Sequence, residues 1–127
     1  MNGEDRADCD VLFTYVPNGQ VYSAPGGAGV YREATGADGT ALLQATGELD
    51  TDSVTCMRQA VADALDEGAT CVRVDLTGIA FGDVSLIDTL LDVQEGPARL
   101  VLVAPLPRRL HHLFDITGTT GRFHFEA

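Results

Sequence analysis

Lysine is absent from this chain of 127 residues, so its eight basic residues are all arginine. Against them stand 19 aspartates and glutamates, which gives a formal net charge of −11 at pH 7. A strongly negative protein repels phosphate backbones and anionic lipid surfaces. Nucleic acid and membranes are therefore poor partners. Proteins with basic patches are better ones, because long-range attraction steers them in.

Cysteine is scarce, and long hydrophobic runs are missing. Cys9, Cys56 and Cys71 are odd in number and lack a short C-x-x-C spacing, which argues against a disulfide framework and against a zinc site. No apolar run approaches membrane-spanning length, and the polar, acidic start does not resemble a secretory signal. We therefore expect a cytoplasmic protein with reduced thiols, Cys56 and Cys71 being small buried side chains.

The length fits one domain with a core of its own, preceded by an extension that differs in composition. Residues 1–29 combine a charged start, a short apolar run and a Gly-rich stretch, so we expect an extension and linker there. Within it, residues 11–16 and 20–22 could pair as a hairpin around Asn18-Gly19. This extension could pair with a sheet edge, cover an interface or mediate dimerisation. Residues 30–127 form the predicted domain.

Strand and helix patterns alternate through this domain, which predicts an α/β fold. Strands 30–34 and 40–46 flank a Gly-rich turn and indicate an antiparallel pair. An amphipathic helix then runs to about Glu67, capped by Thr51, Asp52 or Ser53. The later elements are strand 71–76, a helix from Val84 or Ser85, strand 99–103, a short helix 108–116 and an edge strand 122–125. Together they predict a mixed sheet of four or five strands, with a parallel crossover pair and helices mainly on one face.

The most informative stretch is residues 71–91, where an apolar strand leads through Gly82-Asp83 into a helix. The first turn of a helix has unpaired backbone N–H groups and carries the positive end of the helix dipole. We therefore expect Ser85 to lie where an anion is favoured. The plainer alternatives are that Ser85 is an ordinary helix-start serine and that Asp83 and Asp50 are helix caps.

Three motifs follow one another along the chain: Gly47-Glu48-Leu49-Asp50, residues 74–85 (VDLTGIAFGDVS) and residues 113–118 (LFDITG). In this order they resemble the motifs of the STAS domain of bacterial anti-sigma factor antagonists. The resemblance covers Val30 to Phe125, about three quarters of the chain. It implies a STAS-type fold in which the strand-to-helix turn carries Asp-Ser-Ser-Gly. In the family, the second serine of this motif is phosphorylated by the partner, an anti-sigma factor that is also a protein kinase.

Carried over by position, the resemblance makes Ser85 the phosphoacceptor, with Asp83 and Asp50 as motif aspartates at the same end of the sheet. Val84 and Leu86 stand where the family has serine and glycine. The implied function is that of an anti-sigma factor antagonist, not an enzyme, which needs no cofactor or metal. The expected partner-binding residues are Asp50, Thr51, Gly82, Asp83, Val84, Leu86, Asp88 and Thr89.

The implied partners are an anti-sigma factor with serine kinase activity and a phosphoserine phosphatase, and the chain is expected to be a monomer or a homodimer. The alternative is a STAS-like module that is never phosphorylated and serves a larger assembly by interaction or small-ligand binding. A hydrolase is disfavoured because residues 82–86 do not match Gly-x-Ser-x-Gly. His111 and His112 are adjacent, so on a helix they point about 100° apart and do not chelate one metal.

Overall fold

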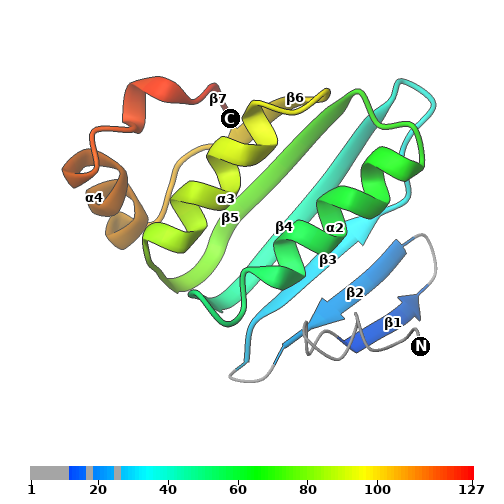
Figure 1. Ribbon diagram of the computed structural model, residues 1–127, viewed down its shortest axis with the longest axis horizontal. Coiled ribbons are helices and arrows are strands. Elements are labelled where there is room, and N and C mark those ends of the chain that lie inside the picture. Colours follow the sequence, from blue (N-terminus) through cyan, green and yellow to red (C-terminus); the bar gives the residue numbers. More distant parts are fainter. Residues whose placement is uncertain (1–11, 17–18, 25–26) are drawn as a thin grey trace.

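Sequential strands lie next to one another throughout a single sheet, in the order β1 to β7 (Figure 1). The computed structural model describes residues 12–16, 19–24 and 27–127, with backbone only for residues 12–16; Cys9 and the expected hairpin turn lie outside them. The strands are β1 Leu12–Val16, β2 Gly19–Ser23, β3 Gly29–Glu33, β4 Thr40–Leu49, β5 Cys71–Gly82, β6 Arg99–Val103 and β7 Phe125–Glu126. The described helices are α2 Thr55–Asp66, α3 Val84–Gln94, α4 Arg108–Ile116 and the 3₁₀ helix η1 Thr120–Arg122.

The sheet changes from antiparallel to parallel at β4. Strands β1 to β4 pair antiparallel with their neighbours, whereas β4, β5, β6 and β7 pair parallel. Helices α2 and α3 connect the parallel strands and lie side by side on one face, and α4 lies beyond α3 (Figure 1). The expected mixed α/β sheet with helices mainly on one face is confirmed, although the seven strands in the described part of the chain exceed the expected four or five.

The core lies between this sheet face and the helices. Alternate side chains of β4 and β5 point toward the helices and are buried, as the period of two in a strand requires. Its fully buried members include Ala41, Leu43, Val72, Val74 and Leu76 from the sheet, with Met57, Leu86, Leu90 and Phe114 from the helices. None of the described helices is long and apolar enough to cross a lipid bilayer.

Strand β5 extends six residues past its expected end at Leu76, because two bulges absorb extra residues. Between Gln44↔Asp75 and Thr46↔Gly78, and again between Gly47↔Ile79 and Glu48↔Phe81, β5 has one residue more than β4. At the first bulge the Asp75 carboxylate accepts hydrogen bonds from the N–H and hydroxyl of Thr77, at 2.9 and 2.7 Å. The Thr77-Gly78 sequence therefore marks a bulge and not the end of the strand.

The last strand is also shorter and later than expected. Residues 120–122 form η1, and only Phe125–Glu126 pairs with β6. The ring of Phe123 turns inward against Phe114, with centroids 5.4 Å apart. The apolar alternation at the end of the chain thus reflects packing against α4 as much as strand formation.

A buried polar network fastens β2 and β3 to α2. The Arg32 side chain, 5% exposed, donates to the Tyr22 hydroxyl at 3.0 Å, to Gln20 Oε1 at 3.1 Å and to Glu67 Oε1 at 2.7 Å. Tyr22, fully buried, donates in turn to Asp63 Oδ2 at 2.6 Å. Burial, followed by the bond to Asp63, raises the pKa of Tyr22 above its ordinary value. Residues 19–23 are therefore an integrated part of the sheet; the proposed boundary at residue 29 stays a prediction.

Candidate functional site

The carboxyl ends of β4 and β5 bring two distant loops together. Leu49 and Gly82 are neighbours in the parallel ladder, and the Asp83 N–H donates to the Leu49 carbonyl at 3.3 Å. The loop that follows β4 therefore lies against the start of α3. We call this the β4–β5 end and define it as residues 50–53 together with residues 81–85.

The two loops meet through a pair of hydroxyl groups. Thr51 Oγ1 lies 2.8 Å from Ser85 Oγ, with Thr51 exposed and Ser85 half-buried. Thr51 is held in position by the turn around it. Asp50 Oδ1 accepts from the backbone N–H groups of Asp52, at 3.0 Å, and of Ser53, at 3.1 Å. Asp50 therefore influences Ser85 indirectly, because it stabilises the turn that positions the Thr51 hydroxyl.

Ser53 completes this turn and was missed by the sequence prediction as a site-forming residue. Its side chain is 3% exposed; Oγ accepts the Asp50 N–H at 2.9 Å and lies 2.8 Å from the Glu48 carbonyl oxygen, to which it donates. Helix α2 begins only at Thr55, and Val54 at its N-cap makes no side-chain capping bond. The expectation that residue 51, 52 or 53 caps α2 is wrong, because the polar groups of this segment are used within the turn.

Asp83 is the N-cap of α3, which was the plainer alternative for this residue. Its Oδ1 accepts the Ser85 N–H at 2.8 Å, and its backbone carbonyl accepts the Leu86 N–H at 3.0 Å. The negative charge that we expect beside Ser85 is therefore supplied in part by the Asp83 carboxylate. A phosphate on Ser85 would have to share this helix end with Asp83.

Leu86 and Thr89 were expected to contact a partner, and their burial contradicts a direct role. Both are 0% exposed. A Cβ placed on Gly82 would lie 2.8 Å from Leu86 Cδ2, so the leucine packs directly against the glycine backbone. Thr89 donates to the Ser85 carbonyl at 2.8 Å. The helical period turns both residues inward, whereas Asp88, on the same helix, is exposed.

The surface of the β4–β5 end carries two exposed apolar side chains. Val84 is 56% exposed and Phe81 is 43% exposed, although large apolar groups in this protein are otherwise mostly inside. Phe81 was not among the expected site residues, because its spacing of two from Ile79 suggests a buried strand position. The second bulge, which lies between Ile79 and Phe81, changes that alternation.

The described residues hold no group of three or more His, Cys, Asp or Glu side chains arranged for a metal ion. His111 and His112 are both exposed, and His111 Nδ1 lies 3.2 Å from Asp115 Oδ2 on the same helix. Cys56 is fully buried, which raises the pKa of its thiol to about 11, so it is not a reactive thiolate. Cys71 is half-buried rather than buried as expected.

The chain belongs to the STAS-domain family, because the family model described as "Mlab, STAS domain" matches residues 33–123. No curated protein sequence matches the chain significantly. Among solved structures, an anti-sigma factor antagonist from Mycobacterium paratuberculosis has a TM-score of 0.67 at 20% identity, covering 81% of this chain and 88% of that one.

Two structures of the anti-sigma factor antagonist SpoIIAA are also similar in fold. The phosphorylated form, from Bacillus, gives a TM-score of 0.58 at 20% identity, covering 77% of this chain and 91% of that one. The unphosphorylated form gives 0.52 at 16% identity, with 92% and 87% covered. At such identities the likeness establishes the fold.

Proposed function

We propose that this chain is an anti-sigma factor antagonist, a binding module without catalytic activity that holds an anti-sigma factor until Ser85 is phosphorylated. One observation carries the proposal: the Ser85 hydroxyl lies at the first turn of α3, paired with Thr51 at 2.8 Å, beside the exposed side chain of Val84. The antagonist fold of the similar solved structures supports it. The partner is then an anti-sigma factor with serine kinase activity, and a phosphoserine phosphatase reverses the switch.

The proposed partner-binding surface is the β4–β5 end extended by one turn of α3. The side chain of Val84 supplies apolar contact, with the backbone at Gly82 next to it, and Thr51, Asp83 and Asp88 supply polar contact around it. Apolar groups enclosed by polar ones are typical of the centre and rim of a protein interface. The acidic charge of the chain favours a partner with a basic surface.

Phosphorylation would disable this surface by charge alone. A phosphoserine adds about −1.5 to −2 charges and three acceptor oxygens. At position 85 these oxygens would lie at the helix end that the Asp83 carboxylate already occupies. In a closed interface such a cluster would cost several kcal/mol through desolvation and repulsion, whereas about 1.4 kcal/mol suffices for a tenfold loss of affinity. The fold would persist, because a helix N-terminus favours negative charge.

Leu86, which replaces the glycine of the family motif, is compatible with a kinase approaching Ser85. Its side chain is 0% exposed and packs against Gly82, so its bulk lies beneath the surface. The kinase would meet Val84 and Thr51 instead. Leucine in place of the motif glycine thus changes the core beneath the site more than it changes the exposed surface of the site.

The test is incubation of the chain with ATP and its cognate kinase-like anti-sigma factor, followed by intact-mass measurement. We expect a gain of about 80 Da, one phosphoryl group, that is lost in Ser85→Ala and kept in Thr51→Ala. No gain, or a gain that persists in Ser85→Ala, contradicts the proposed switch.

A second candidate is a STAS module that is never phosphorylated and serves a larger assembly by interaction. The observation in its favour is that Asp83 caps the Ser85 N–H and Thr51 pairs with the Ser85 hydroxyl, as at an ordinary capped helix start. The same measurement separates the two candidates, because this module gains no phosphoryl group on incubation with ATP and the kinase.

A further inference from the structure

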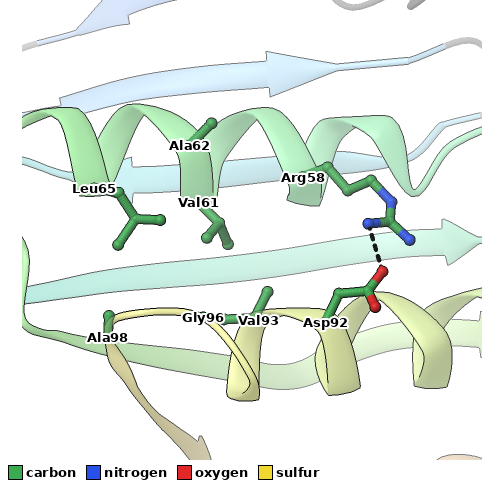
Figure 2. A pocket seen from close by; sticks show the side chains of 8 residues that line it. All are labelled: Arg58, Val61, Ala62, Leu65, Asp92, Val93, Gly96 and Ala98. Carbon is green, nitrogen blue, oxygen red and sulfur yellow. Dashed lines mark hydrogen bonds and ion pairs between the residues drawn. The ribbon is translucent and has the colours of Figure 1, made fainter.

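A groove between α2 and α3 lies away from Ser85, and the proposed function does not use the residues that line it. It has a volume of about 220 Å³ and is open to solvent along the helices (Figure 2). From Ser85 to Asp92, the groove residue on α3 nearest to it in sequence, the helix rises by about 10 Å. The lining residues are Arg58, Val61, Ala62 and Leu65 from α2, Asp92 and Val93 from α3, and Gly96 and Ala98 from the turn after it.

The floor of the groove is apolar. Val61 and Leu65 point from α2 toward α3, where Val93 faces them, as Figure 2 shows. Val93 and Leu65 are both half-buried, so this apolar surface is only partly covered by the fold. Gly96 adds no side chain at the end of the groove, which leaves the floor open there.

The groove lining has one residue of each charge, and further carboxylates flank it on both helices. Arg58 and Asp92 form an ion pair of 3.0 Å across the groove, with side chains 47% and 62% exposed. Asp88 lies four residues before Asp92, and Glu95 lies three residues after it. Both are exposed, so the three carboxylates form a row along α3. On α2 the row of Arg58 and Ala62 continues to Asp66, which is also exposed. Four carboxylates therefore stand along a groove that has one guanidinium.

We propose that this groove binds a short amphipathic helix of a partner protein, with its apolar side chains in the groove and its arginines or lysines against Asp88, Asp92 and Glu95. Charge complementarity selects this occupant, because an acidic segment would meet repulsion from the row of carboxylates along α3. The size fits an anchor: a cavity of about 150 Å³ holds a benzene molecule. The groove thus has room for one or two apolar side chains, and the remainder of the helix would lie on the surface.

The test is a ¹H–¹⁵N NMR titration of the full chain with a synthetic helical peptide that has leucines along one face and arginines on either side. We expect shift changes at Val61, Leu65 and Val93, and weaker binding as salt rises. A matched peptide with glutamate in place of arginine should produce none. Absence of changes at the groove with the arginine peptide, or equal binding of both peptides, overturns the proposal.

Substitutions at exposed positions separate a loss of peptide binding from a loss of folding. Ala62→Trp should fill the groove and abolish peptide binding, and Asp92→Asn should weaken it about threefold, as expected for an exposed ion pair. Glu48→Gln, which removes a charge on the other face of the sheet, should leave it unchanged. Unaltered binding by Ala62→Trp with an unchanged melting temperature contradicts the proposal. So does a dimer of the chain that becomes a monomer in Ala62→Trp, because the groove would then belong to a second copy.

Discussion

Thr51 and Ser85 are 34 residues apart in sequence, yet their hydroxyl oxygens lie 2.8 Å apart. The contact exists because parallel strands β4 and β5 end together, with β5 leading directly into α3 and β4 into the turn that precedes α2. Carboxyl ends of neighbouring parallel strands are where open α/β sheets place their functional loops. A modification of Ser85 would therefore directly change the contacts of the loop after β4, without any movement of the sheet.

The Asp83 cap should stabilise α3 measurably. In Asp83→Ala the Ser85 N–H loses its acceptor at 2.8 Å, so we expect the free energy of unfolding to fall by about 1 kcal/mol and the melting temperature by about 4 °C. Thermal and urea unfolding followed by circular dichroism measure both. Asp83→Asn, which keeps a capping oxygen, should lie close to the unmodified chain; equal losses in the two variants would contradict the capping role.

The network around Arg32 should depend on the Tyr22 hydroxyl. Tyr22→Phe keeps the ring but takes away the group that contacts both Arg32 Nε and Asp63 Oδ2. Leaving buried polar groups unpaired costs about 1–3 kcal/mol, and we expect the free energy of unfolding in urea to fall by that amount. Tyr31→Phe, at a half-buried position on the other sheet face, is the matched control. Equal effects of the two substitutions would show that the network does not stabilise the fold.

Acid should weaken the fold partly through Glu67. Desolvation by burial opposes ionisation of this carboxylate, but hydrogen bonds from Arg32 and Thr35 outweigh it and lower its pKa. A carboxylate with a lowered pKa stabilises the fold above the unfolded-state pKa, and this contribution disappears as pH falls through the folded-state pKa. The melting temperature should therefore decline less steeply between about pH 5 and about pH 3 in Glu67→Gln than in the unmodified chain. Parallel declines would contradict the assignment.

The regular part of the fold followed from the sequence. The strand Arg99–Val103 and helix α4 were predicted to the residue, and the start of α3 was predicted as Val84 or Ser85, because each has a clear period and a clear boundary. These elements depend on local signals that tertiary contacts reinforce. The order of motifs also predicted the family.

The irregular part did not follow from the sequence. The bulges in β5 are set by its pairing with β4, so neither the extension to Gly82 nor the outward turn of Phe81 could be inferred from local alternation. The role of Ser53 depends on where the Glu48 carbonyl lies in space. The burial of Leu86 was predictable from helical spacing, but the family motif led us to expect it at the interface as well.

The most direct test of the central proposal is the affinity of the Ser85→Asp variant for the cognate anti-sigma factor, measured by isothermal titration calorimetry beside the unmodified chain and Ser85→Asn. The extra charge next to Asp83 should weaken binding more than tenfold, whereas the neutral variant should stay within about threefold and both should keep the fold. Equal affinity of the unmodified chain and a folded Ser85→Asp variant would contradict the account.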